Sequence, residues 1–343
     1  MPPQCGGTAL NLFRYSKQNQ SIMTRYLHTL VLLLAVLVLP SSCIKEDYDD
    51  CDNVIIYFQY LADGKTNVLN DYITKVDLYV FDGGGHIMGV GHYSEDELKH
   101  YAAIPSFRLT PGEKYRVVAV GNAFNRTEVE NLTSETDFNK IFIQHPAWGS
   151  GEGKVDGHDH NYLGQLDFTM PGGENFTVYR DTVTLLSAHI NVDIEINGLP
   201  APDALGEGGE IPYELRIEES NAQTDFNGDV NMEEKGTCYP ALIYDKERNC
   251  YRTDDLCLFR MNDHAGHFDK ECCEHRLVLI DKRTGERLVD GSIYNYVNAN
   301  KDEIDLTKQE ATLPIAIQFY GTNVEIKLPE WVIVDVNRNG TKK

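Results

Sequence analysis

The stretch Ser187–Gly198 reads SAHINVDIEING, and its central residues alternate between apolar and polar side chains. Ile190, Val192, Ile194 and Ile196 are each separated by one polar residue, so an extended strand here has one apolar face and one polar face. This pattern is typical of a half-buried antiparallel strand. The stretch therefore predicts a β-sheet that packs one face against a core.

Segments with strand character occur on both sides of this stretch. Upstream they are Val54–Tyr60, Lys75–Phe81, Ile87–Val90, Tyr115–Val120 and Thr177–Leu186, and downstream Tyr213–Glu218, Tyr239–Tyr244, His275–Asp281, Thr312–Phe319, Val324–Leu328 and Trp331–Val336. The turn Asp82–Gly85 (DGGG) predicts a hairpin between Lys75–Phe81 and Ile87–Val90. Helical signals are few, and one is Ser94–Tyr101, which opens with the spacing of a capping box. Many short strands between turns predict an all-β fold of β-sandwiches.

A break in the strand pattern suggests two domains. Gly198–Glu210 (GLPAPDALGEGGE) is rich in Pro and Gly and has no periodicity, which is typical of a linker. We therefore predict an N-terminal β-sandwich domain at residues 54–198, a linker at 199–210 and a C-terminal β-sandwich domain at 211–343. The chain is long enough for two domains of ordinary size.

Residues 1–42 have the features of an export signal. Leu30–Leu39 (LVLLLAVLVL) is apolar throughout. It is shorter than the roughly 20 residues that span a bilayer, but it fits the apolar core of a signal peptide, about 7–15 residues. Arg25 supplies a positive charge before it, and no acidic residue precedes Cys43. From Met23 onward the proportions are those of a standard signal peptide, so residues 1–22 are predicted to be an upstream extension.

The residues after the apolar core resemble a lipobox. Pro40–Ser42 leads into Cys43, which predicts cleavage before Cys43, acylation (palmitate) of its thiol and an acidic tether at residues 43–53. The residues behind Cys43 resemble the surface-export signal of Bacteroidetes lipoproteins, formed here by Lys45, Glu46 and Asp47. We therefore predict a surface-exposed lipoprotein of the cell outer membrane. The alternative is ordinary signal-peptide cleavage that leaves Cys43 as a plain thiol.

The chain is strongly acidic, with 31 Lys and Arg against 53 Asp and Glu. The predicted signal removes Arg14, Lys17 and Arg25, so the net charge changes from −22 to −25 in the mature chain. A surface of this sign repels phosphate backbones, which argues against nucleic acid as a partner.

Cysteines are concentrated in one part of the predicted C-terminal domain. Apart from Cys5 and Cys43 there are six, and five of them are Cys238, Cys250, Cys257, Cys272 and Cys273; the sixth is Cys51. Export to an oxidising compartment makes one or two disulfide bonds among the five plausible. Spacing alone does not give the pairing.

Other candidate sites have weak patterns. Asp225–Glu233 (DFNGDVNME) places oxygen ligands at alternate positions, but the EF-hand pattern fails, so a polar turn is expected. His158–His160 (HDH) is one candidate for metal binding, and a flexible loop without a metal is the alternative. The second such candidate consists of His264, His267, Cys272, Cys273 and His275. Neither group has zinc-site spacing, and no nucleophile elbow, P-loop or HExxH motif is present. We predict no metal site, no cofactor and no enzyme activity.

The order of motifs along the chain resembles the FimB/Mfa2 family of Bacteroidetes fimbrial subunits, which includes anchor proteins. The motifs are the Cys43 tether, VDLYVFD at Val76–Asp82, YRVVAVGN at Tyr115–Asn122, the strand at Ser187–Gly198 and a strand that begins at Trp331. The resemblance implies two transthyretin-like β-sandwich domains and assembly by β-strand exchange. It also implies other fimbrial subunits (pilins) as partners, a place in a fimbrium and a role in cell adhesion.

The strand Trp331–Val336 (WVIVDV) is a candidate for strand exchange. Its candidate residues are Trp331, Val332, Ile333, Val334 and Val336. The alternative is an internal strand of the second sandwich. Two functions are therefore compared: a lipid-tethered fimbrial anchor or minor subunit, and a surface glycan- or metal-binding lipoprotein outside any pilus. The sequence favours the first.

Overall fold

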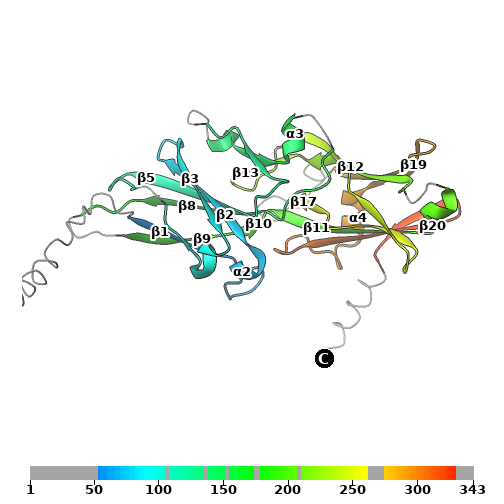
Figure 1. Cartoon of the computed structure of the whole chain (residues 1–343), viewed down its shortest axis with the longest axis horizontal. Coiled ribbons are helices and arrows are strands. Elements are labelled where there is room, and N and C mark those ends of the chain that lie inside the picture. Colours follow the sequence, from blue (N-terminus) through cyan, green and yellow to red (C-terminus); the bar gives the residue numbers. More distant parts are fainter. Residues whose placement is uncertain are drawn as a thin grey trace, which may run out of the picture. The chain divides into compact units, whose positions relative to one another are not determined.

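Strands form most of the chain that the structure describes. The computed structural model describes residues 53–105, 108–133, 138–150, 154–173, 178–206, 210–261 and 274–329. They form several β-sheets, which confirms the predicted all-β sandwich fold (Figure 1). The α-helices are short: α2 at Leu69–Tyr72, α3 at Pro146–Ser150 and α4 at Ile293–Ala299. None of the helices in these ranges has the length and apolar character that crossing a membrane requires.

Two sheets enclose the first hydrophobic core. One has the strand order β10-β8-β5-β2-β3, formed by Leu186–Ser187, Tyr162–Thr169, Lys114–Gly121, Lys75–Asp82 and Ile87–Ser94. The other has the order β4-β1-β9, formed by Ala102–Ala103, Val54–Gln59 and Tyr179–Thr184. Side chains from both sheets are buried together, among them Ile56, Leu78 and Val117.

Local turn chemistry fixes the two ends of β2. At one end, the predicted hairpin to β3 is present, and Gly85 closes its turn with a φ of 82°, which favours glycine. At the other end, Asn122 follows β5 with a φ of 54°. The Asn122 side chain accepts from Thr74 N at 3.0 Å and donates to Tyr72 O at 2.8 Å. These contacts pin β2 between its neighbours β3 and β5.

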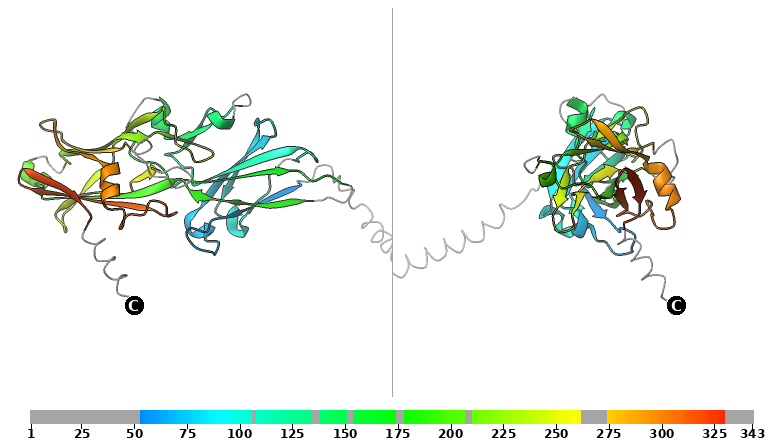
Figure 2. Two further views of the ribbon diagram at one scale, coloured as in Figure 1. Left: turned by 180° about the vertical axis from the view of Figure 1, so that it is seen from behind. Right: turned by 90° about the vertical axis from the view of Figure 1, so that its right-hand side faces the viewer.

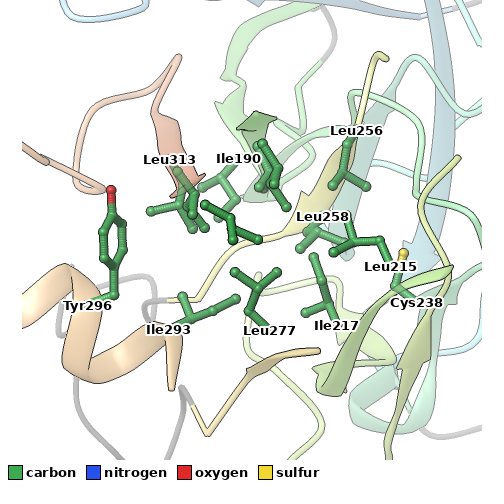
Figure 3. Close-up of a cluster of buried hydrophobic side chains, with 14 of the residues drawn as sticks. Ile190, Leu215, Ile217, Cys238, Leu256, Leu258, Leu277, Ile293, Tyr296 and Leu313 are labelled. Atoms are coloured by element: carbon green, nitrogen blue, oxygen red, sulfur yellow. The ribbon is translucent and has the colours of Figure 1, made fainter. Parts of the chain in front are cut away.

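A second pair of sheets encloses a separate core. One has the order β15-β16-β11-β20-β21, formed by Leu242–Asp245, Cys250–Thr253, His189–Asn197, Thr312–Tyr320 and Asn323–Lys327, and β17 (Cys257–Phe259) also pairs with β11. The other has the order β14-β12-β18-β19, formed by Lys235–Cys238, Tyr213–Asn221, Arg276–Asp281 and Glu286–Ser292. Figure 3 shows Ile190 and Leu313 from one sheet close to Leu215 and Leu277 from the other.

The helix α4 packs beside β20 and β21 (Figure 2). Ser292 caps its first turn by accepting a hydrogen bond from Asn295 N at 3.2 Å. The Tyr296 hydroxyl donates to Pro314 O at 2.6 Å and lies 3.2 Å from Lys327 O. The helix therefore holds both strands of the β20–β21 hairpin.

A small fifth sheet covers the outer face of the sheet β10-β8-β5-β2-β3. Its order is β13-β7-β6, formed by Gln223–Asp225, Phe142–Gln144 and Glu128–Glu130. A third buried cluster lies beneath it and includes Phe226, Phe138 and Ile143 with Tyr79 and Phe81 of β2. Because β13 comes from the predicted C-terminal domain and β7 from the predicted N-terminal domain, the two halves of the sequence share this sheet.

The domain boundary around residues 199–210 stays a prediction. The strand β11 ends at Asn197, just before it, yet pairs in parallel with β20 and antiparallel with β16 and β17, which all follow it. The described residues, from 53 to 329, all belong to one compact unit. Strands from before and after the predicted linker therefore belong to the same sheets.

The helix predicted at Ser94–Tyr101 is shorter than expected. Only Glu97–His100 is helical, as one 3₁₀ turn. Ser94 belongs to β3, and Tyr101 ends the turn with a φ of 56°. The predicted capping contact is nevertheless present, because Ser94 N donates to Glu97 Oε2 at 2.9 Å. Because Ser94 pairs with Lys75 of β2, it belongs to the sheet and not to the predicted helix.

Candidate functional site: the first strand and its neighbours

The first strand after the predicted tether, β1, is the central strand of its sheet. It pairs in parallel with β9 along its whole length, Val54–Gln59. On its other edge it pairs antiparallel with β4 at Ile56 and Tyr57. The N–H of Phe58 also donates to the carbonyl of Tyr101 at 2.7 Å. The backbone of β1 is therefore bonded on both sides.

The inward face of β1 is part of the first core. Val54, Ile56, Phe58 and the following Tyr60 are at most 1% exposed. Burying one large apolar side chain contributes about 1.5–3 kcal/mol. Removal of β1 would take its buried side chains out of the core and expose the residues that they cover, among them Leu78 and Val117, so the fold depends on this strand.

Two asparagines hold the ends of β1. At its start, the buried Asn53 side chain both donates to Leu109 O and accepts from Leu109 N, each at 2.9 Å. At its end, the Asn67 side chain accepts from Tyr60 N at 3.0 Å and donates to Phe58 O at 3.1 Å. Both ends of the strand are thus tied to neighbouring loops by paired hydrogen bonds.

The end of β1 also contacts the segment that leads into β20. The Tyr60 hydroxyl donates to the Glu310 carboxylate, and the Tyr162 hydroxyl donates to the same oxygen at 3.0 Å. Burial, followed by the hydrogen bond to Glu310, raises the pKa of Tyr60 far above its ordinary range. Burial and the charge of Glu310 also raise the pKa of Tyr162. Both phenols therefore remain protonated donors.

Neighbouring residues fix the position of Glu310. Gln309 N donates to the Asp63 carboxylate at 3.2 Å, and the Gln309 side chain accepts from Ser187 N at 2.8 Å. The guanidinium group of Arg260 donates to Ser187 O at 2.7 Å and to Leu306 O at 2.8 Å. The segment 306–310 is therefore held against the first core from several sides.

In the part of the chain that the structure describes, β3 is the last strand of its sheet. Its residues Ile87–Ser94 include no Asp, Glu, Lys, Arg or Pro, and Met88 is 46% exposed. The edge strands β9, β19 and β21 each include at least two charged residues. Charged residues and proline on an edge strand usually prevent unwanted pairing with another strand. The edge at β3 is therefore suited to accept an additional strand.

Several predicted site residues lie outside the residues that the structure describes. They are Cys43, Lys45, Glu46, Asp47, Trp331, Val332, Ile333, Val334, Val336, His264 and His267. Lipidation, surface export and strand exchange at these positions stay predictions.

Three of the five cysteines predicted to form disulfides are buried free thiols. They are Cys238, Cys250 and Cys257, whereas Cys272 and Cys273 lie outside the described residues. Burial raises the pKa of Cys238 to about 12 and is also the main cause of the raised pKa values of Cys250 and Cys257. The predicted disulfide pairing stays untested. The burial of these thiols does, however, give an expectation for their reactivity.

We expect Cys238 and Cys257 to resist alkylation in the native protein. The thiolate is the reactive form, and both thiols are completely buried and held protonated. Treatment with iodoacetamide, before and after unfolding in guanidinium, followed by peptide mass spectrometry, measures this directly. Labelling only after unfolding is the expected result. Rapid labelling of the native protein would contradict it, and labelling that requires a reductant would reveal a disulfide instead.

The histidines of the HDH motif lie in different environments. The ring of His158 stacks on Phe259 at 3.9 Å, whereas His160 stacks on His189 at 4.8 Å. The Asp159 carboxylate accepts two backbone N–H groups, at 2.8 and 3.1 Å. Across the described ranges, no group of three or more His, Cys, Asp or Glu side chains is placed to hold a metal ion. Asp159 therefore has a structural role, because it holds the backbone of Phe124 and Arg126 in place.

The loop that begins at Asp225 forms the polar turn expected from its sequence. The Asp225 carboxylate accepts from Asn227 N at 2.9 Å and from Asp229 N at 2.8 Å. Gly228 N donates to Asp225 O at 3.0 Å, which closes the turn. The alternating oxygens therefore organise the backbone, and the turn places Phe226 in the third buried cluster.

These features define a structural β-sandwich protein with a first strand built into its core and an unguarded sheet edge. The chain belongs to the family of fimbrillin-A associated anchor proteins Mfa1 and Mfa2, whose family model matches residues 48–337. The match confirms the resemblance seen in the sequence, and the chain is a fimbrial subunit from a family of structural proteins.

Solved structures of Porphyromonas and Bacteroides proteins share the fold. The fimbrial anchor protein Mfa2 from Porphyromonas gingivalis is 14% identical, with a TM-score of 0.58 over 80% of this chain and 95% of that chain. A candidate adhesin from Bacteroides ovatus is 13% identical, with a TM-score of 0.61 over 84% and 97%. A candidate polysaccharide-binding protein from Bacteroides thetaiotaomicron is 15% identical, with a TM-score of 0.57 over 81% and 98%. No curated protein sequence matches the chain.

Proposed function

We propose that this fimbrial subunit is the anchor of its fimbrium, held in the outer membrane by lipid on Cys43. The observation that carries the proposal is the place of β1, which begins at Val54, shortly after the tether, and is bonded on both edges. Its inward side chains are buried in the first core. A chain that retains this strand keeps its lipid covalently connected to its folded part.

The predicted tether gives this connection a limited reach. Residues 43–53 span at most about 35 Å when fully extended. The Lys45–Asp47 signal would direct the lipidated chain to the outer surface of the cell. The folded part would then stay close to the membrane, where the base of a filament needs support.

Two features suit the attachment of a filament by strand complementation. Trp331–Val336 is a candidate donor strand for a neighbouring subunit. The edge strand β3, which includes no Asp, Glu, Lys, Arg or Pro, is suited to pair with a strand from outside. In both cases backbone hydrogen bonds would supply affinity, and side chains at alternate positions would supply specificity.

Intact mass spectrometry of the protein extracted from outer membranes tests the anchor proposal, with attached filaments retained. We expect a mature chain that begins at acylated Cys43, includes Val54–Gln59 and copurifies with a pilin. The matched control is Cys43→Ala, which should be released from the membrane and lose the filament. A lipid-free chain that lacks β1 would contradict the anchor role and identify a stalk subunit. A lipidated chain without filament partners would contradict the fimbrial attachment.

A further inference from the structure

We propose that the contact between Tyr60 and Glu310 is a mechanical clamp that transmits tensile force from β1 into the β20–β21 hairpin. The inference rests on the proposed anchor function, in which a filament pulls against the membrane tether. It assigns a force-carrying role to named side chains.

Force from the tether would enter the fold at the start of β1. The strand pairs in parallel with β9 over the six residues Val54–Gln59. A pull along β1 acts across these evenly spaced inter-strand hydrogen bonds in shear, so they are loaded together. The paired hydrogen bonds between Asn53 and Leu109 lie at the point of entry and share this load.

The clamp lies at the opposite end of β1. Tyr60 is completely buried, and its ring packs edge-on against Tyr162 at 4.8 Å and against Tyr72 at 5.4 Å. Its hydroxyl donates to Glu310. For β1 to slide towards the membrane, this ring must leave its pocket and the phenol must leave a charged acceptor. The clamp therefore resists the first movement that a pull would cause.

Beyond the clamp, the force has a direct route into the second half of the chain. Glu310 is separated from β20 by a single residue, Ala311. β20 pairs in parallel with β11 from Thr312 to Gln318 and antiparallel with β21. The contact from Gln309 N to Asp63 closes a second link beside the first. Tension on β1 is thus passed to a strand that is bonded on both edges.

Single-molecule pulling of the full mature chain, with handles at its two ends, tests the clamp. Tyr60→Phe removes the hydroxyl but keeps the buried ring, and we expect the first unfolding step at constant force to become about tenfold faster, the effect of one hydrogen bond to a charged group. Glu310→Gln should give a smaller acceleration, because glutamine keeps a neutral acceptor for the phenols of Tyr60 and Tyr162. The matched control is Tyr244→Phe, which removes a phenol that bonds only locally to Asn249 at 2.6 Å.

A second pulling geometry separates a mechanical role from a merely structural one. With handles at the exposed residues Asp203 and Glu247, the pulled segment includes neither Tyr60 nor Glu310, and Tyr60→Phe should leave the rate unchanged. Equal acceleration in both geometries, or none in the first, would overturn the clamp. The result does not depend on lipid or filament, so failure of the clamp and failure of the anchor role are distinguishable.

Discussion

Replacing Phe226 with alanine is expected to lower the free energy of unfolding by about 3–5 kcal/mol, the usual cost of deleting a buried aromatic ring. The side chain is 2% exposed, and its ring lies 5.2 Å from that of Tyr79, 6.1 Å from Phe81 and 5.9 Å from Phe138. It comes from the turn after β13, whereas its partners come from the first half of the sequence. The cavity would therefore loosen the contact that joins the two halves.

Guanidinium unfolding followed by circular dichroism measures this change. The matched control is Phe124→Ala, because Phe124 is 49% exposed and its removal leaves no cavity. We expect the control to change stability by less than about 1 kcal/mol. Comparable losses of unfolding free energy for the two variants would show that Phe226 does not stabilise the contact between the two halves of the chain.

The pattern at Ile190, Val192, Ile194 and Ile196 predicted the faces of β11 correctly, since all four side chains are at most 2% exposed. Alternation identifies a buried face because successive side chains of a strand point to opposite sides. It does not identify the partner strands. β11 pairs in parallel with β20, more than a hundred residues later, through contacts that leave no local pattern in the sequence.

The strand β8 was not predicted, although a signal was present. Tyr162, Gly164, Leu166 and Phe168 share one face, but the glycine interrupts the apolar series. A Cβ atom at Gly164 would lie 2.4 Å from the carbonyl oxygen of Thr184, so the close approach of the two sheets requires glycine there. Tertiary packing thus imposed a residue that weakens the strand pattern.

The contact between Tyr60 and Glu310 illustrates what sequence reasoning could not reach. The two residues are 250 positions apart. Tyrosine at the end of an apolar strand and glutamate in a polar loop are both ordinary choices. Only the fold brings them together, so the clamp has no sequence signature, whereas the predicted tether and the predicted export signal each rest on a short local motif.

Acidification is expected to destabilise the folded chain between about pH 6.5 and pH 3. His158, His189 and His275 are at most 1% exposed. Burial lowers the pKa of His158 and His275 to about 3 and that of His189 to about 4, whereas an unfolded histidine has a pKa of about 6.5. Charges nearby add to the effect, from His145 and Arg126 on His158 and from Lys235 on His275.

The sign of the effect follows from proton binding. Below about pH 6.5 the unfolded chain binds protons at these histidines and the folded chain does not, so stability falls as the pH falls. The loss is complete once the pH is below the folded pKa. For one histidine lowered to about 3, the total is about 5 kcal/mol. Three such groups approach the whole stability of a domain, about 5–15 kcal/mol, so we expect acid unfolding above about pH 4.

The variant His158→Phe isolates one of these contributions. Neither ring nitrogen of His158 has a hydrogen-bond partner among the described residues, and the ring stacks on Phe259 at 3.9 Å. Phenylalanine keeps the stacking and removes the titration, so stability near neutral pH should change by less than about 1 kcal/mol. At about pH 4.5 the variant should be more stable than the natural chain by about 2–3 kcal/mol. Urea unfolding at both pH values measures this, with the exposed His100→Gln as control. An unchanged difference between the two pH values would show that His158 accepts its proton without loss of the fold.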